Sequence, residues 1–519
     1  MKKAIYLIIA LIGLSAPSCS DSMLDFSPTD SGSGKELLKS ASTAITSVNG
    51  VYRSMWTAGW STTANTHQCF GIAAYNLALD CMADDLIMQS QGNGWFWGDH
   101  CYNVKSNYTS SAFRSYDVWY ANYKWIANVN YIIDAEPEMA GTEADVAYVA
   151  GQAYAIRALC YLNLATWFSR APYNSLTGAS RWNEPCVPVY TTGTSIDTGG
   201  QPRESLRTVY GRIDQDIDRA IELLEKARET TLAENNKSHI NLYVALGIKS
   251  RACLVEGDWD GAYAAAKRVI DEGGYAVGTK SDLTGGMNSL DKQNVMWGAG
   301  IQVADQAGGY AGFFTHMDNK EGAYAKSAPK LISKQLYNRI SATDIRRDWW
   351  DPSDKESPYV SKKFSFANVA SFLGDYIYMR VEEMYFTAAE AALRLDDLKS
   401  ARELMNTVMA ERDPGYSANN RSGTLLGATT TTWTGSFLEN ILTHRRIELW
   451  GEYGRLFDVR RLGQGIDRRT DDGFSEECIS MMNRRNVNIT KADTYDWVLT
   501  IPKAELDANP NINEEDQNP

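Results

Sequence analysis

Apolar residues recur every three or four positions through long stretches of this 519-residue chain. That spacing gathers apolar side chains on one face of an α-helix, whereas the alternation typical of strands is scarce. The sequence therefore predicts a mainly α-helical fold. The predicted helices cover residues 113–134, 145–168, 205–226, 240–255, 259–271, 376–395, 398–411 and 437–450.

Two of these stretches align with each other without a gap. Residues 252–262 (ACLVEGDWDGA) match residues 391–401 (AALRLDDLKSA). Each copy comprises a helix, a short turn and a second helix, close to the 34-residue unit of a tetratricopeptide repeat. Ala262 and Ala401 fall where two antiparallel helices must approach closely. Because one such unit cannot bury its apolar face alone, we expect further helix pairs to stack on it.

The N-terminus has the pattern of a secretory signal. Met1-Lys2-Lys3 is basic, an eleven-residue apolar run follows, and small residues precede Cys19. The arrangement resembles a bacterial lipobox, so we expect residues 1–18 to be a lipoprotein signal peptide and Cys19 to be lipidated. Residues 19–34 then form the lipid anchor and a flexible leader. The alternative is ordinary cleavage near this point, with Cys19 free or removed.

Residues 35–519 are predicted to form a single domain, in which long insertions interrupt the helical repeats and favour a packed body over an open solenoid. The helical repeat portions cover about 111–170, 203–272, 374–412 and 436–461. The loop-rich insertions cover 53–108, 274–373, 413–435 and 462–500.

Composition argues against several classes of function. The chain carries 51 Lys and Arg against 64 Asp and Glu, and a net charge of −13 does not suit a nucleic-acid binder. Seven cysteines follow Cys19, with no CxxC pair, so neither a zinc site nor a complete disulfide framework is indicated. The five histidines are scattered without ligand spacing. Asp351 to Glu356 could hold calcium, but this stretch is more typical of a solvated turn. We therefore predict no metal and no cofactor.

Aromatic residues are abundant, with 15 Trp, 28 Tyr and 14 Phe. Those on predicted helices, such as Trp119, Tyr120 and Tyr123, are expected to pack in the core. Other aromatics lie in glycine-rich stretches that cannot form an amphipathic face, and a flat ring there can bind the apolar face of a sugar while amides and acids bind its hydroxyls. A lid over the core is the alternative. The candidate ligand-binding residues are Trp95, Trp97, Phe96, Asn93, Asp99, Trp56, Trp60, Trp297, Tyr310 and Phe313.

Three groups of acidic residues invite a catalytic interpretation. Glu382 and Glu383 suggest a glycosidase pair, but neighbours on a helix point about 100° apart and cannot face each other across one sugar. We expect them to make structural contacts between helices. Asp84-Asp85 could face a ligand or cap a helix. In residues 444–461, five arginines and three acids are spaced for pairing along a helix, Arg445 with Glu448 among them, which favours an ion-pair network at the end of the fold. No catalytic residue is predicted.

Several segments resemble, in the right order, the SusD-like (RagB/SusD) family of Bacteroidetes cell-surface lipoproteins. The helix Arg380-Val-Glu-Glu-Met-Tyr-Phe-Thr-Ala-Ala-Glu-Ala391 is similar to the most recognisable helix of that family, and His444 to Arg461 is similar to its late signature, with His444 where the family usually has glutamate. The other matching segments are 19–28, 116–130, 151–164 and 501–519.

This resemblance implies a fold of tetratricopeptide-type helix pairs packed against an irregular, loop-rich half that carries the ligand site. It also implies a lipid-anchored outer-membrane protein that faces the cell exterior, captures oligosaccharides and delivers them to a TonB-dependent (SusC-like) transporter. In the family the site is an aromatic arc from the same regions, which adds weight to Trp95 and Trp97. The alternatives are a surface glycoside hydrolase, a lid that binds the transporter but no glycan, and a variant that takes peptides.

Overall fold

The computed structural model describes residues 34–57, 66–103, 113–195, 197–233, 237–303, 311–427, 433–491 and 494–519. The predicted signal peptide, Cys19 and nearly all of the leader lie outside the described residues, as do Trp60 and Tyr310.

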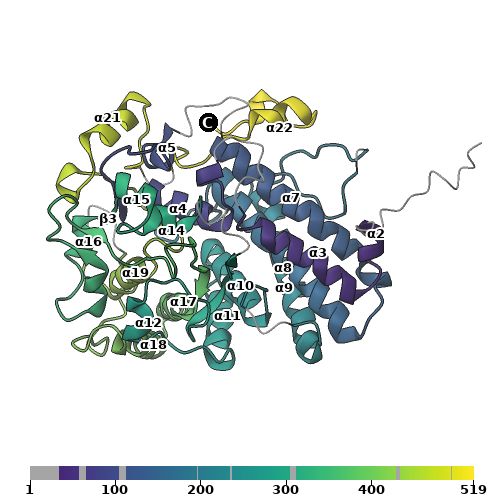
Figure 1. Ribbon diagram of the computed structural model, residues 1–519, viewed down its shortest axis with the longest axis horizontal. Coiled ribbons are helices and arrows are strands. Elements are labelled where there is room, and N and C mark those ends of the chain that lie inside the picture. The colour runs from purple at the N-terminus through teal and green to yellow at the C-terminus, as the bar shows by residue number, and fades with distance from the viewer. Residues whose placement is uncertain are drawn as a thin grey trace, which may run out of the picture.

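Long helices form the right and centre of the molecule in Figure 1, where α3 and α7 to α11 lie, and α17, α18 and α19 continue the array at the left. Helices that follow one another in the chain pack against one another: α7 packs on α8, α8 on α9, α9 on α10 and α10 on α11. This is the arrangement of a tetratricopeptide-type array. The bounds are α3 Ala41–Ser54, α7 Phe113–Ala135, α8 Glu143–Phe168, α9 Leu206–Lys226, α10 Leu242–Glu256, α11 Trp259–Glu272, α17 Val381–Arg394, α18 Leu398–Ala410, α19 Phe437–Glu448 and α20 Arg455–Leu462.

The internal repeat corresponds to two stacked helix pairs. The pairs α10–α11 and α17–α18 are the two copies, and α11 packs directly on α17 although more than a hundred residues separate them. Ala262 and Ala401 are fully buried at the helix contacts, as their small size predicts. The residues between α11 and α17 therefore form an insertion that extends outside the helical array, and the two repeat copies still stack on each other.

That insertion and residues 66–103 contribute most of the loop-rich half, at the left of Figure 1. A four-stranded sheet has the order β1-β3-β5-β4, and a second sheet pairs β2 with β6, antiparallel throughout. The strands are β1 Leu86–Met88, β2 Val295–Ala299, β3 Lys330–Ile332, β4 Trp350–Asp351, β5 Val360–Ser361 and β6 Tyr376–Arg380. The short helices are α2 Gly34–Leu37, α4 Ile72–Met82, α5 Trp97–His100, α12 Lys280–Thr284, α14 Phe313–Met317, α15 Ala323–Ser327, α16 Lys334–Tyr337, α21 Glu476–Arg484 and α22 Lys503–Ala508.

The predicted secondary structure differs from the structure at two places. Residues 376–380 were expected to begin a helix, but they form β6, and α17 starts at Val381. Alternate aromatic residues in Tyr376-Ile-Tyr378 pack well on a pleated sheet, and β2 provides the partner strand. Helix α4 was not predicted because ten of its eleven residues are buried, so its sequence has no polar face to reveal a helical period.

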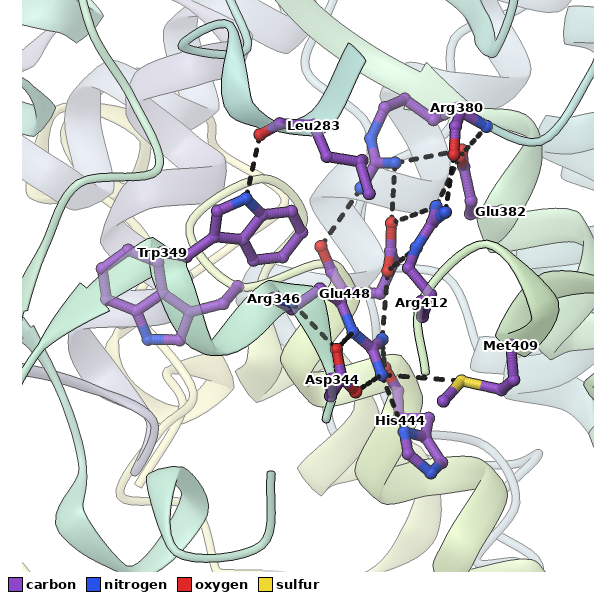
Figure 2. Close-up of polar contacts among 12 residues, drawn as sticks. Leu283, Asp344, Arg346, Trp349, Arg380, Glu382, Met409, Arg412, His444 and Glu448 are labelled. Carbon is purple, nitrogen blue, oxygen red and sulfur yellow. Dashed lines mark hydrogen bonds and ion pairs between the residues drawn. The ribbon is translucent and has the colours of Figure 1, made fainter. Parts of the chain in front are cut away.

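A buried ion-pair network joins the two halves (Figure 2). Its centre is the carboxylate of Glu448 on α19, which accepts hydrogen bonds from Arg346 at 3.0 Å, from Arg380 at 3.0 Å and from Arg412 at 2.9 and 3.0 Å. Glu382 lies beside it and pairs with Arg412 at 2.8 Å and with Arg380 at 3.0 Å. None of these five side chains is exposed.

A second part of the network closes the end of the fold. Asp458 on α20 pairs with Arg445 at 2.9 Å and with Arg461 at 2.7 Å, and Arg461 also holds Glu390 of α17. The predicted role of residues 444–461 as an ion-pair network is confirmed. The predicted pairing of Arg445 with Glu448 along the helix was wrong, because each side chain instead pairs with residues of other elements.

We expect acid to destabilise the protein through these carboxylates. Burial alone would raise the pKa of Glu390, Glu448 and Glu452, but the adjacent cations hold the pKa of each below the usual glutamate value. A carboxyl group whose pKa is lower in the folded state contributes stability that is lost as pH falls through that lowered pKa. The free energy of unfolding should therefore fall between about pH 5 and pH 2.

Chemical denaturation at a series of pH values measures this effect. Glu390→Gln should show a shallower decline in acid than the unmodified chain, since it removes one of the depressed carboxyl groups. Glu403→Gln, at an exposed position on α18, should keep the original decline. Parallel curves for all three proteins would contradict the assignment.

Candidate ligand-binding surface

The loop after β1 carries Trp95, and its backbone decides which aromatic rings reach the surface. Gly92 has a φ of +49°, and a Cβ there would lie 2.5 Å from the carbonyl oxygen of Ser327, so glycine is required. Phe96 also has a left-handed φ, of 61°, and its N–H donates to Oε1 of Gln68 at 2.7 Å. This turn sends Phe96 and Trp97 into the core and leaves Trp95 half-buried.

Three rings from separate segments gather at this point, and we call them the Trp95 platform: His67, Trp95 and Tyr324. His67 stacks on Trp95 with centroids 5.0 Å apart and planes inclined by 23°, and Tyr324 meets Trp95 edge-on at 6.0 Å. The hydroxyl of Tyr324 lies 2.7 Å from Nδ1 of His67, within hydrogen-bond distance. The neighbouring rings therefore fix the orientation of Trp95.

Polar groups border the platform. Asn93 is exposed, and its side-chain oxygen accepts a hydrogen bond from Ser327 at the end of α15. Close by, an open pocket of about 720 Å³ has charged and amide side chains on its walls, including Asn319, Lys326 and Asp351. A flat ring beside amide and charged groups suits a ligand with apolar faces and polar edges.

The structure places most of the other predicted ligand residues in the interior. Phe96, Trp97, Trp297 and Phe313 are all buried, so none offers an open ring face. Trp297 illustrates the reason: it packs edge-on against Tyr378 at 5.0 Å, and its Nε1 donates to the carbonyl of Ser238. The three consecutive aromatics were predicted to lie in a loop, but α5 begins at Trp97 and buries it.

Asp99 also has a structural partner. It is fully buried and forms a two-pronged ion pair with Arg114 of α7, at 2.8 and 2.9 Å. Arg114 in turn donates to the carbonyl of Gln68, the residue that anchors Phe96. Asp99 thus supports the loop below the platform. Trp56 is half-buried just after α3, with the Arg53 guanidinium 5.5 Å from its ring, and remains a candidate for ligand contact.

Two members of the platform were not predicted. His67 had been considered only as a metal ligand, and Tyr324 lies at the end of a glycine-rich stretch from which other aromatics were chosen. No local pattern reveals either residue, because the platform depends on contacts across 257 sequence positions.

Asp84 and Asp85 are buried, so of the two roles considered for them the ligand-facing one does not apply. Asp85 pairs with Arg446, and Asp84 pairs with Arg455 at 3.0 Å. They join α4 to the α19–α20 region.

Glycoside hydrolysis needs two carboxyl groups that flank the scissile bond, and two acids whose pKa values are raised far above the usual range, Asp80 and Glu256, lie in different parts of the fold. Burial raises the pKa of Asp80 to about 8, but Asp80 is sealed inside the core and accepts a hydrogen bond from the backbone of Arg455. Burial also raises the pKa of Glu256 to about 9, at the end of α10 in the helical half. Neither belongs to the Trp95 platform.

Metal-ligating residues do not gather in the described part of the chain: no three His, Cys, Asp or Glu side chains there could hold an ion together. Asp351 and Asp354 accept hydrogen bonds from the loop that follows them. The seven cysteines after Cys19 are all buried. Within the described residues, no helix has the length and apolar character that a membrane span requires.

Two family models match separate segments of the sequence. A model of the SusD family matches residues 326–519, and a model described as "Starch-binding associating with outer membrane" matches residues 43–254. The chain belongs to the SusD-like family. The resemblance noted in the sequence is thereby confirmed. No curated protein matches the sequence.

Solved structures show the same SusD-like fold. A SusD-like carbohydrate binding protein from Bacteroides vulgatus is 25% identical and aligns with a TM-score of 0.73, over 92% of this chain and 98% of that one. A SusD superfamily protein from Bacteroides thetaiotaomicron is 22% identical, with a TM-score of 0.72 over 92% and 100% of the two chains. Surface glycan-binding protein A from B. thetaiotaomicron, in complex with laminarihexaose, is 16% identical, with a TM-score of 0.64 over 92% and 99%.

Proposed function

We propose that this SusD-like protein binds glycans at the cell surface, without catalysis, and uses the Trp95 platform to hold them. The proposal rests on the half-buried Trp95, whose ring is fixed by His67 and Tyr324. One of the matching family models is described as starch-binding, which agrees with this assignment. The relatives described as carbohydrate-binding and bound to laminarihexaose support the same ligand class.

The chemistry of the platform agrees with a neutral oligosaccharide. A sugar ring can lie on the open part of Trp95, because its C–H groups are apolar, while Asn93 and side chains near α15 reach its hydroxyl groups. The net charge of −13 disfavours an anionic polymer. Because the rings are held in place before binding, little side-chain entropy is lost when a ligand docks.

The proposal extends to the location and the partner of the protein. Lipidation at Cys19 would anchor the chain to the outer membrane, with the folded domain facing outward. Captured oligosaccharide would pass to a TonB-dependent, SusC-like transporter. Support for these steps comes from the signal-like N-terminus and from the family description "associating with outer membrane".

Calorimetric titration with a broad panel of neutral oligosaccharides tests the site. Trp95→Ala should weaken binding by about tenfold, since a lost stacking contact of about 1.5 kcal/mol corresponds to that ratio. Trp182→Ala is a matched control, because Trp182 is another half-buried tryptophan and contacts Tyr210, not the platform. It should keep the original affinity.

Three results would contradict the proposal or select an alternative. Equal affinity in Trp95→Ala and the unmodified chain would refute the site. Release of reducing sugar by the purified protein would favour a hydrolase. Recovery of a large membrane barrel in a pull-down, with no binding across the panel, would favour a lid that recognises only the transporter.

A further inference from the structure

The helical half contains a second hollow, away from the Trp95 platform. A cavity of about 490 Å³ lies between α7, residues 190–195 and 198–200, and α22. Figure 1 shows α22 beside the upper end of α7, whereas α5 and α15 lie in the loop-rich half. The volume is within the range of about 300–1,000 Å³ that is usual for small-molecule sites.

Four aromatic side chains line this cavity: Trp119, Tyr120, Tyr123 and Tyr190. The first three lie on α7 and were expected to be core residues, yet Tyr120 and Tyr123 are only half-buried, and so is Tyr190. The cavity is thus a feature that helical periodicity could not reveal.

Hydrogen bonds hold Tyr123 and Tyr190 in fixed positions, and Tyr120 stacks on Tyr116 with centroids 5.5 Å apart. The hydroxyl of Tyr123 donates to the carbonyl of Pro188 at 2.7 Å, and the hydroxyl of Tyr190 accepts from the N–H of Gln201 at 2.9 Å. The two rings meet edge-on at 5.8 Å. Trp119 packs against Tyr123 at 4.9 Å. Because the hydroxyls are directed to the backbone, the rings present carbon surface to the cavity.

Polar groups complete the lining. Glu505 on α22 accepts hydrogen bonds from Nε1 of Trp119 at 3.2 Å and from Asn509 at 2.8 Å, so its carboxylate is fixed at one wall. Lys124 is exposed near Tyr120, with its Nζ 5.7 Å from the ring centroid. Thr194, Ser195 and Thr198 add hydroxyl groups. One lysine is too little positive charge for a nucleotide phosphate chain, and the polar wall does not suit an alkyl chain.

We propose that this cavity is a second carbohydrate site, which holds one or two neutral sugar rings against Tyr120 and Tyr190 while Glu505 binds hydroxyl groups. This second-site proposal takes its ligand class from the proposed function, but it does not depend on the Trp95 platform. A protein with two such sites would contact one long glycan, or two chains, in both halves of the fold.

Saturation-transfer NMR and calorimetry with neutral trisaccharides of glucose, mannose, galactose and xylose test the inference. Trp95→Ala removes the platform, and we expect at least one trisaccharide to bind this variant still. Adding Tyr120→Ala should reduce the remaining affinity by about tenfold or more. Tyr243→Ala in the same Trp95→Ala background is the control, because Tyr243 is a half-buried tyrosine on α10 that packs on Tyr275. Circular dichroism checks that each variant is folded.

The outcomes separate the two proposals. Complete loss of trisaccharide binding in Trp95→Ala, or residual binding that Tyr120→Ala leaves unchanged, overturns the second site and leaves the platform in place. Glu505→Gln provides an independent check, since it keeps the shape of the wall and should weaken the same residual binding. Failure of the unmodified chain to bind any trisaccharide or longer glycan contradicts both proposals.

Discussion

Glu448→Ala is expected to lower the free energy of unfolding by about 3–5 kcal/mol, because it removes the shared partner of three buried arginines. Arg346, Arg380 and Arg412 all donate to this carboxylate, and their side chains have no exposure to water. Without Glu448, the carboxylates among the described residues that still pair with these arginines are Asp344, Glu382 and Glu452. An uncompensated buried charge costs far more than the net contribution of an intact pair.

Denaturant titration followed by fluorescence and circular dichroism measures the change, with the transition midpoints compared at pH 7. Glu222→Ala is the matched control: Glu222 also pairs with two cations, Arg219 and Lys226, but at the exposed surface of α9. An exposed pair contributes about 0–1 kcal/mol, so this variant should unfold close to the unmodified protein. Glu448→Gln separates charge from volume and should fall between the two. Equal midpoints for Glu448→Ala and Glu222→Ala would show that the network does not stabilise the fold.

The helical half was predictable because its information is local. Helices α7 to α11 begin and end within about three residues of the ranges predicted from apolar spacing. Capping supplied some boundaries: Thr142 accepts a hydrogen bond from the N–H of Asp145, and Gly257 ends α10 with a φ of 76°. The internal repeat also correctly indicated two related helix pairs, and the structure stacks them through α11 and α17.

The candidate site was less predictable because its information is distributed. The glycines correctly indicated a loop over residues 92–96, and Trp95 is its half-buried ring. Nothing near Phe96 or Trp97 shows that Gln68 and the Asp99–Arg114 pair draw this segment inward, since those contacts join parts of the chain that are far apart in sequence. The same holds for the charged residues. Arg445 and Glu448 have ideal spacing for an ion pair along one helix, but each pairs instead with buried residues of other elements. The sequence identifies which side chains are available, and the packing decides which of them reach solvent.

Trp97→Ala should separate structural support from ligand contact, and it is the second large effect that we expect. Trp97 is 3% exposed and packs near His100, whose ring stacks on Phe474. Truncating a buried tryptophan leaves a cavity and typically costs about 3–5 kcal/mol of unfolding free energy. Trp95→Ala removes a half-exposed ring and should cost much less stability.

The two neighbouring variants are therefore expected to show opposite profiles. Trp97→Ala should melt well below the unmodified protein but keep its glycan affinity when titrated far below that melting temperature, because the Trp95 platform is held independently by His67 and Tyr324. Trp95→Ala should melt close to the unmodified protein and lose affinity. Trp97→Phe restores much of the missing volume and should recover most of the stability, which checks that the loss arises from the cavity. If Trp97→Ala instead kept its stability and lost binding, then Trp97 would be a ligand contact that opens to the surface, and the platform would be larger than the three rings assigned to it.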